Sequence, residues 1–250
     1  MPSLKQLIRK WNPIKKYVYY GEFASHEEAL IFAKSSQSYG DKNYDNHSIS
    51  RINFSEKVTN GRNAIVPLIL ALSNLNNKKS AKILDYGGGV NPIFAHLSER
   101  EKEKIKCYVI ERKELYEKLN NNVPEHLKNN LIYINSLNDL KKIDLIYFGS
   151  SIQYIPNYES LLSDLLKLCP EFIIFSESIF TNDGRDYFVI QSNMKRNSFP
   201  NHFISEQAIV KELSNYGYQC IYNKPAGGNH SHKTIDKSTY SSRSIIFRRK

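Results

Sequence analysis

The sequence predicts an α/β protein with an open, mostly parallel sheet, and two patterns support this prediction. From residue 81 onward, short apolar segments alternate with amphipathic ones, as they do where helices connect the strands of a parallel sheet. The first apolar segment runs directly into the glycine-rich turn 87–89, which is typical of a ligand-binding turn at the end of a strand. With 250 residues, the chain is long enough to bury one substantial core.

Residues 1–78 are expected to form a helical cap or lid region, and residues 79–250 the sheet domain. Apolar residues at positions 4, 7, 8 and 11 share one face of a helix. The stretch 4–11 therefore predicts a helix that either packs on the protein or lies on a membrane surface as a peripheral anchor. Ser25 and Glu28 form a capping box that begins a second helix, and residues 64–75 predict a third.

The elements of the sheet domain follow from their residue patterns. Ser205 is expected to cap the last helix and Gly217 to end it. The final two strands are expected to form an antiparallel pair. The strands are predicted at 81–86, 106–111, 131–136, 143–150, 171–178, 218–223 and 242–249. The helices are predicted at 92–100, 112–122, 157–169 and 206–217.

Composition narrows the class of protein. Hydrophobic content of 40% and charged content of 24% are those of an ordinary globular domain. No apolar run approaches the ~18 residues of a membrane span, and no secretory signal is expected at the N-terminus. Cys107, Cys169 and Cys220 lack the spacing of a zinc site or a disulfide framework, so no metal and a reducing cytoplasm are expected.

The formal net charge of +10 permits two interpretations. A basic protein often binds RNA or another polyanion. Here the lysines are scattered, often beside asparagines, and no dense basic block occurs. A solvated lysine-rich surface is therefore expected, and no nucleic-acid partner is predicted.

The stretch 83–92 reads Ile-Leu-Asp-Tyr-Gly-Gly-Gly-Val-Asn-Pro, and it predicts a close approach of the backbone to a ligand. Glycines remove Cβ atoms and adopt positive φ where it is needed. Asn91 and Pro92 stand where a third spaced glycine is usual. Since Asn is a favoured N-cap and Pro a favoured first helical residue, we expect the next helix to begin there.

Two acidic residues indicate which ligand this turn binds. Glu111 ends the second strand, where an acid accepts hydrogen bonds from ribose hydroxyls in NAD and S-adenosylmethionine sites alike. Asp85 is expected to place a carboxylate at the edge of the site, where it would repel a pyrophosphate and attract a sulfonium. Together with Gly87 and Gly89, these residues predict S-adenosylmethionine; a tight turn without a ligand is the alternative.

Several segments extend this interpretation, namely GEFASHEEA, SYGDKNYDN, LDYGGG, VIE, YFGSSIQYI and FTNDGRDYFVIQ with SFPNHFISE. In them the chain resembles the class I S-adenosylmethionine-dependent methyltransferases, and more narrowly those encoded in bacterial capsule and lipopolysaccharide gene clusters. The resemblance covers most of the chain and implies a Rossmann-like, mostly parallel seven-stranded sheet. Residues 176–180 read Ser-Glu-Ser-Ile-Phe where that family usually has an Asp-Arg-Thr-Pro-Phe-like segment, which inverts the local charge and suggests a different acceptor.

The resemblance also implies roles for individual residues. The glycine loop would surround the methionine part of the cofactor, the acid after the second strand would hold the ribose, and the segment after the fourth strand would face the acceptor. The implied cofactor residues are Asp85, Gly87, Gly88, Gly89, Glu111, Ser150, Ser151, Ile152, Gln153 and Tyr39. Tyr44 would close over the substrate as part of a lid. Ordinary packing is the alternative for each single residue.

Three further groups are candidates for acceptor chemistry. An acceptor hydroxyl benefits from a general base, and His202 and His230 are the candidates. His230 and His232 would otherwise bind a metal or lie in an exposed loop. Asp183 and Arg185 are candidate substrate residues: Arg185 would hold an anionic acceptor, or would pair with Asp183 on the surface.

The sequence thus predicts an S-adenosylmethionine-dependent methyltransferase, with S-adenosylhomocysteine as product, that O-methylates a small-molecule acceptor. The resemblance specifies a capsule or lipopolysaccharide precursor such as a sugar nucleotide, a sugar phosphate or a phosphoramidate-type glycan. Three alternatives stay open: an RNA methyltransferase, a nicotinamide-dependent oxidoreductase and a non-catalytic binding module.

Overall fold

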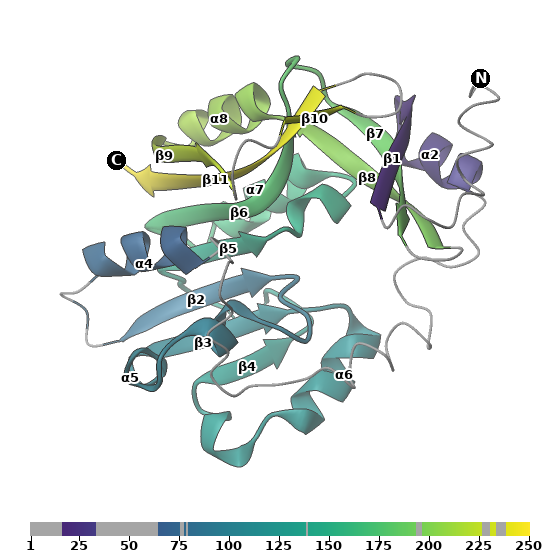
Figure 1. Cartoon of the computed structure of the whole chain (residues 1–250). Helices are drawn as coiled ribbons and strands as arrows, with labels where there is room; N and C mark the ends of the chain where they lie inside the picture. Colours follow the sequence, from purple (N-terminus) through teal and green to yellow (C-terminus); the bar gives the residue numbers. More distant parts are fainter. Residues whose placement is uncertain are drawn as a thin grey trace.

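Seven strands form the core of an 11-stranded sheet among the described residues (Figure 1). The structure, a computed structural model, describes residues 17–33, 65–75, 78, 80–138, 140–193, 197–226, 231–233 and 239–250. The seven strands are β2 (Ala81–Tyr86), β3 (Ile105–Ile110), β4 (Leu131–Ile134), β5 (Leu145–Gly149), β6 (Phe172–Thr181), β9 (Tyr218–Pro225) and β11 (Thr239–Arg249). Their spatial order is β4-β3-β2-β5-β6-β11-β9.

The five strands β2 to β6 are parallel. After β4 the chain crosses the sheet, so that β5 pairs with the opposite edge of β2. β3 and β4 lie on one side of β2, whereas β5 and β6 lie on the other. At such a switch point the connections leave in opposite directions, so that a crevice opens beyond the carboxyl ends of the two central strands. The glycine turn follows β2 and therefore lies at this crevice.

The antiparallel pair at the C-terminus is confirmed. β11 runs antiparallel between β6 and β9, with Ile245 opposite Phe175 and Phe247 opposite Cys220. With this pair, the predicted Rossmann-like α/β sheet of seven strands is present. The alternation of apolar and amphipathic segments from residue 81 predicted the mostly parallel α/β sheet, and the family resemblance implied its seven strands.

Helices cover both faces of the sheet, and each face has its own apolar core. The helices are α4 (Ile65–Asn74), α6 (Lys113–Asn122), α7 (Tyr158–Leu166) and α8 (Glu206–Asn215). α4 and α6 pack on the face that carries Ile83 and Ile174, whereas α7 and α8 pack on the face that carries Leu84 and Ile173. Since successive side chains of a strand point to opposite faces, strands buried on both sides are apolar throughout.

The segment Tyr17–Phe23 is a strand, an element that the predicted helical cap did not include. This strand, β1, pairs antiparallel with β7 (Tyr187–Asn193), which pairs with β8 (Asn197–Ser205). β8 reaches the seven-stranded core through its pair with the end of β6. The sequence Tyr-Val-Tyr-Tyr-Gly-Glu-Phe is rich in strand-forming residues, so a local signal existed. The division at residue 78 stays a prediction, because residues 1–16 and 34–64 lie outside the described residues.

Three predicted helix boundaries are present. α2 (His26–Ala33) follows Ser25, whose hydroxyl accepts the Glu28 N–H at 3.1 Å; the Glu28 carboxylate accepts the N–H of Ala24 at 3.1 Å. Ser205 caps α8 by accepting the Ala208 N–H at 3.2 Å. Gly217 follows α8 with a φ of 80°, as expected of a residue that ends a helix.

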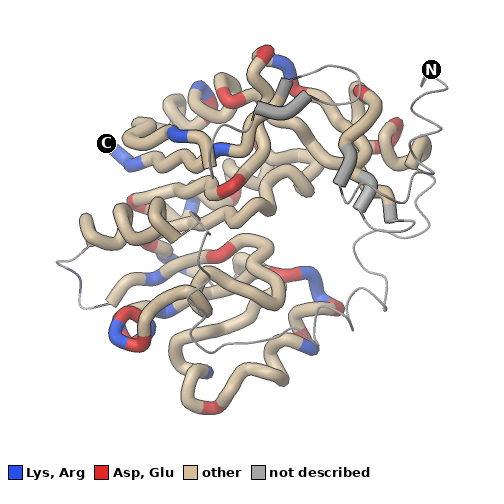
Figure 2. Tube along the Cα trace, viewed as in Figure 1, with Lys and Arg blue, Asp and Glu red and all other residues tan. Residues whose placement is uncertain are grey.

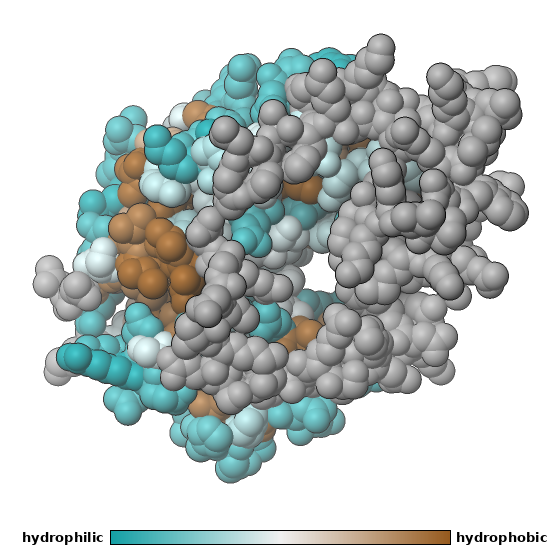
Figure 3. Space-filling model, in the orientation of Figure 1, coloured by the Kyte–Doolittle hydropathy of each residue, from teal (hydrophilic) through white to brown (hydrophobic). Residues whose placement is uncertain are grey.

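An apolar area lies over α4, and no separate basic face is visible along the described elements in the view shown. Val66, Ile69 and Leu70 are 43–44% exposed on the outer side of α4, where Figure 3 shows a brown area. Figure 2 shows lysines and arginines interspersed with acids along the described elements. Among the described residues, no helix combines the length and the hydropathy that a membrane crossing requires.

Candidate functional site

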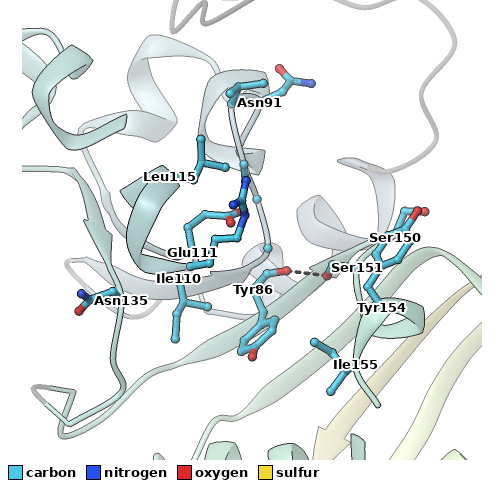
Figure 4. Close-up of a pocket in the computed structure, with 15 residues that line it drawn as sticks. Tyr86, Asn91, Ile110, Glu111, Leu115, Asn135, Ser150, Ser151, Tyr154 and Ile155 are labelled. Atoms are coloured by element: carbon cyan, nitrogen blue, oxygen red, sulfur yellow. Dashed lines mark hydrogen bonds between the residues drawn. The ribbon is translucent and has the colours of Figure 1, made fainter. Parts of the chain in front are cut away.

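A cavity of about 700 Å³ lies beyond the carboxyl ends of β2, β3, β4 and β5 (Figure 4). Figure 4 shows Glu111 and Asn135 on one side of Tyr86, and Ser150 and Tyr154 on the other. The residues that line it are Tyr86, Gly87, Gly88, Gly89, Val90, Asn91, Ile110, Glu111, Arg112, Leu115, Asn135, Ser150, Ser151, Tyr154 and Ile155. This volume is that of a small-molecule or cofactor site.

The glycine loop has its shape because two of its glycines adopt positive φ and a third leaves no room for a side chain. Gly87 and Gly89 have φ values of 72° and 57°. A Cβ on Gly88 would lie 2.4 Å from the Asp85 carboxylate, and one on Gly87 would lie 2.9 Å from the Cβ of Ser151. The loop therefore lies directly on its neighbours, and the three predicted glycines all line the cavity.

Asp85 lies beneath the loop and does not line the cavity, which corrects its predicted place at the edge of the site. Its side chain is 1% exposed, and Oδ2 accepts the N–H of Ile93 at 2.7 Å. Burial raises the pKa of Asp85 to about 7; the Ile93 N–H opposes this rise, and the charge of Glu111 adds to it. The carboxylate thus fixes the loop from inside the protein.

The segment after the loop is also different from the prediction. Instead of one helix at 92–100, a short 3₁₀ helix (Ile93–His96) precedes α5 (Glu99–Lys102). Pro92 has extended backbone, and no side chain of the preceding residues caps the 3₁₀ helix locally. The predicted role of Asn91 as N-cap is therefore wrong, because Asp85 provides the acceptor from the end of β2. Asn91 lines the cavity instead.

Glu111 directly follows β3 and contributes the acidic side chain of the cavity. Its Oε1 accepts the N–H of Gly89 at 2.9 Å, and the Tyr133 hydroxyl donates to the Gly89 carbonyl at 2.9 Å. Burial raises the pKa of Tyr133 far above its usual value, so the phenol stays protonated and able to donate. The loop is thereby held from β3 and β4 as well as from β2.

The segment after β5 divides into residues that line the cavity and residues that support it. Ser150 and Ser151 line it, and the Ser151 hydroxyl donates to the Tyr86 carbonyl at 2.5 Å (Figure 4). Ile152 is fully buried in the core, and Gln153, 1% exposed, donates to the Ser150 carbonyl at 2.8 Å. The predicted positions of Ile152 and Gln153 on the cofactor surface are therefore corrected: neither residue lines the cavity.

Nine lining residues were not predicted, although some of them lie at or just after the end of a strand. Asn135 follows β4, and Arg112 follows the predicted Glu111, so the rule that ligands meet the carboxyl ends of strands would have found them. Tyr154 depends on distant partners: its hydroxyl lies 3.3 Å from Oε1 of Gln191, which accepts from Asn201 at 2.6 Å. No local pattern indicates that contact with β7 and β8.

His202 lies behind the cavity wall rather than in it. Its ring is stacked on Phe188 with the centroids 4.2 Å apart, and Nδ1 lies 3.4 Å from the carbonyl of Ile155, a lining residue. Nε2 is 4.0 Å from the carboxylate of Asp186, which also accepts the Tyr158 hydroxyl at 3.0 Å. Burial lowers the pKa of His202, with Asp186 opposing the shift. The structure therefore gives His202 a supporting position and corrects its predicted place as a base in the site.

Arg185 and Asp183 pair with each other on the surface, which is the alternative that the sequence left open. The Arg185 guanidinium contacts the Asp183 carboxylate at 2.7 Å and the Glu22 carboxylate at 3.2 Å. Neither Arg185 nor Asp183 lines the cavity. Their predicted role in binding substrate is therefore corrected to a surface ion pair that ties β1 to the turn after β6.

Four predictions fall on residues outside the described ones. They concern the lid tyrosines Tyr39 and Tyr44, the candidate base His230, and the helix at 4–11. The side chain of His232 is likewise not described. Among the residues that the structure describes, no three His, Cys, Asp or Glu side chains are arranged to hold a metal ion.

Solved structures share this fold at low sequence identity. A S-adenosylmethionine-dependent methyltransferase from Methanosarcina mazei is 12% identical, with a TM-score of 0.50 over 70% of this chain and 96% of that one. One from Clostridium acetobutylicum is 13% identical, with a TM-score of 0.50 over 83% and 96%. The 1,6-didemethyltoxoflavin-N1-methyltransferase of Burkholderia thailandensis, solved with S-adenosylhomocysteine and its namesake substrate, is 11% identical, with a TM-score of 0.50 over 95% and 93%.

These similarities establish the fold class. Neither a protein-family model nor a curated protein sequence matches the chain. The sheet order, the antiparallel C-terminal pair and the similar structures together define a class I methyltransferase fold.

Proposed function

We propose that this protein is an S-adenosylmethionine-dependent methyltransferase, and one observation beyond the fold carries the proposal. A dinucleotide site binds pyrophosphate with the free N–H groups of the helix that follows the glycine turn. Here the Ile93 N–H donates to Asp85, and Pro92 has no N–H. The start of that helix therefore offers little to a pyrophosphate, which favours a cofactor without one.

The cavity fits such a cofactor. Because Gly87 and Gly88 let the loop lie against Ser151 and Asp85, the space above the loop stays clear for the ligand. Glu111 lies at the position where a carboxylate accepts hydrogen bonds from the ribose hydroxyls of a cofactor. The hydrogen bond that it accepts from the Gly89 N–H holds its side chain at the loop. When bound, the cofactor supplies a methyl group on a positively charged sulfur. The chain supplies orientation, which contributes a large part of the rate in a displacement at carbon.

We also propose a small-molecule acceptor that is methylated on oxygen, in the cytoplasm. The resemblance of several segments to methyltransferases of surface-polysaccharide gene clusters supports a precursor of capsule or lipopolysaccharide as the acceptor. The Burkholderia protein of the same fold is named for a small-molecule substrate. The acceptor would enter beside Ser150 and Tyr154, because these residues line the side of the cavity opposite Glu111.

Calorimetric titration of the full chain tests the cofactor. We expect saturable binding of S-adenosylmethionine and of S-adenosylhomocysteine at one site, and no binding of NADH. Gly88→Ala should weaken the binding of both ligands. Glu103→Gln is the control: Glu103 is exposed and precedes β3, at the end of the sheet away from the cavity, so both affinities should stay unchanged. Binding of NADH without binding of S-adenosylhomocysteine would overturn the proposal.

Transfer of a labelled methyl group tests the acceptor. Sugar nucleotides and sugar phosphates should accept the label, and RNA should not. Label in RNA with none in the sugar derivatives would contradict the glycan assignment and leave the cofactor assignment standing.

A further inference from the structure

Tyr154 connects the cavity to the strands β1, β7 and β8. It ends the 3₁₀ helix Ile152–Tyr154, which follows β5, and it lines the cavity on the side opposite Glu111 (Figure 4). Its ring packs against that of Phe199 in β8, with the centroids 5.8 Å apart. Tyr154 is therefore a cavity residue that contacts elements outside the seven-stranded core.

The strand register places three side chains on the face of β7 and β8 that meets Tyr154. Gln191 of β7 pairs with Phe199 of β8, so these two side chains share a face. Asn201 lies two residues further along β8 and points to the same side, because alternate residues of a strand share a face. Tyr154 contacts both Gln191 and Phe199, which shows that this face is the one toward the cavity.

Gln191 and Asn201 form a buried amide pair. Their side chains belong to residues that are 5% and 0% exposed. Nδ2 of Asn201 donates to Oε1 of Gln191 at 2.6 Å, whereas Oδ1 of Asn201 is buried and accepts no hydrogen bond among the described residues. The reverse orientation of the Asn201 amide would bring two oxygens together. An unsatisfied buried oxygen lowers stability, and its presence in a folded protein calls for an explanation.

The explanation is that the amide pair fixes the direction of the Tyr154 hydroxyl proton. The hydroxyl lies 3.3 Å from Oε1 of Gln191. An amide oxygen carries no proton, so the phenol is the donor in this contact. Because Asn201 donates to the same oxygen, Gln191 cannot turn its NH₂ group toward the phenol without losing that bond. A phenol whose single proton is directed to Gln191 engages a ligand in the cavity only as a hydrogen-bond acceptor.

We propose that Tyr154 binds a hydroxyl group of the methyl acceptor by accepting its hydrogen bond, and that Gln191 and Asn201 are positioning residues that act through the phenol. The inference rests on the proposed function and gives it a residue that determines specificity. The ionised phosphates of a sugar nucleotide present only acceptor oxygens, so they find no donor at this phenol. The sugar part of such an acceptor, rather than its phosphates, therefore contacts Tyr154.

Kinetics of the full chain test this assignment. Transfer of labelled methyl groups is measured to UDP-glucose, GDP-mannose and glucose 1-phosphate, and kcat/KM is determined with the probe that takes the label. Tyr154→Phe keeps the ring and removes the hydroxyl. We expect kcat/KM for the acceptor to fall about 3- to 10-fold, with the dissociation constant of S-adenosylhomocysteine unchanged.

Tyr218→Phe is the matched control. It removes a buried hydroxyl that donates to the Pro170 carbonyl at 2.6 Å, at the end of the sheet where β6 begins and away from the cavity. Both constants should equal those of the wild type. An unchanged kcat/KM in Tyr154→Phe, or an equal fall in the control, would overturn the role of Tyr154 and leave the proposed function standing.

A double variant tests the positioning role. Gln191→Met removes the amide at similar length and should lower kcat/KM for the acceptor about 3-fold. If Gln191 acts through the phenol, Gln191→Met combined with Tyr154→Phe should be no worse than Tyr154→Phe alone, whereas independent damage multiplies. Losses that multiply overturn the positioning role.

A spectroscopic measurement tests the same contact without an acceptor. In protein that contains isotope-labelled tyrosine, the Tyr154 Cζ resonance is the one that is missing in Tyr154→Phe. It should shift in Gln191→Met, because the phenol loses its hydrogen-bond partner, and an unmoved resonance contradicts the contact. A wild-type chain that binds S-adenosylhomocysteine but methylates none of the three probes overturns the inference together with the sugar acceptor, and leaves the cofactor proposal standing. A chain that does not bind S-adenosylhomocysteine overturns both proposals.

Discussion

The two sides of the cavity obtain the same unusual backbone from different residues. On the side of β2 and β3, positive φ values belong to Gly87 and Gly89; on the side of β5, a positive φ of 58° belongs to Ser150. Glycine takes such angles freely, whereas a residue with a Cβ costs about 1–2 kcal/mol. The first side is therefore relaxed, and the second is held in place by its neighbours.

The hydrogen bonds of the two sides show how this difference is maintained. Asp85 and Glu111 accept backbone N–H groups of the glycine loop and its continuation. After β5, side chains donate to carbonyls instead: Ser151 to Tyr86, and Gln153 to Ser150. The comparison suggests that the relaxed side is a fixed support for the cofactor, and that strain is reserved for the side that meets the acceptor.

The largest effect is expected from a side chain in the glycine loop. Gly88→Ala places a Cβ 2.4 Å from a buried carboxylate that is itself bonded to Ile93, so we expect the free energy of unfolding to fall by about 3 kcal/mol. Urea denaturation measures this fall. Gly217→Ala is the control, because nothing lies within 4 Å of its Cβ and only the cost of its positive φ, about 1 kcal/mol, remains. Equal losses of unfolding free energy in the two variants would show that the loop accommodates a Cβ at position 88 without a clash.

The next effect depends on pH and concerns the support beneath the loop. The folded pKa of Asp85, about 7, exceeds its ordinary 3.8, so the folded chain binds the extra proton between these values and stability falls as pH rises from 4 to 7. Asp85→Asn keeps an acceptor for Ile93 without the charge. We expect it to raise the free energy of unfolding by about 2 kcal/mol at pH 8 and to change it little at pH 5.

Urea midpoints of both proteins at the two pH values measure this difference. A variant that is less stable than the wild type at pH 8 would contradict a buried, unfavourable charge at Asp85. The same result would restore the interpretation in which the ionised carboxylate contributes to the site directly.

Glu111 should affect ligand binding more than folding. Glu111→Gln retains an oxygen for the Gly89 N–H, so stability should change little. The loss of a charged acceptor for the ribose should weaken S-adenosylhomocysteine about tenfold, or about 1.4 kcal/mol. Calorimetry measures this change, and an unaltered dissociation constant would exclude Glu111 from the cofactor site.

The smallest effect is expected on the strained side. Ser150→Gly relieves a positive φ and loses a contact with Gln153 at 3.1 Å, so a net gain of about 0.5 kcal/mol is expected. Ser150→Ala loses the contact without the relief and should be less stable than Ser150→Gly. If alanine is the more stable of the two, the backbone at Ser150 is not strained.

Local patterns predicted helix caps correctly only where no distant residue takes over the role. Ser205 caps its helix as expected, since a cap involves residues three positions apart. Asn91 has the residue type of a cap but not the role, because Asp85 reaches the same N–H from the end of β2. His202 resembled a base in the sequence, and only its packing on Phe188 and Ile155 places it behind the wall.

The sequence by itself determined the seven strands of the α/β core, the crevice at which a ligand is expected to bind, and the glycines that shape its loop, but it did not indicate the strands β7 and β8. These follow from hydrophobic periodicity and backbone preference, which act over a few residues. Only the tertiary structure decided that Asp85 lies under the loop while Glu111 lies in the cavity, and that His202 lies behind the cavity wall. The reason is that burial and strand register are set by residues far apart in the chain, so the same residue type can support a site or line it.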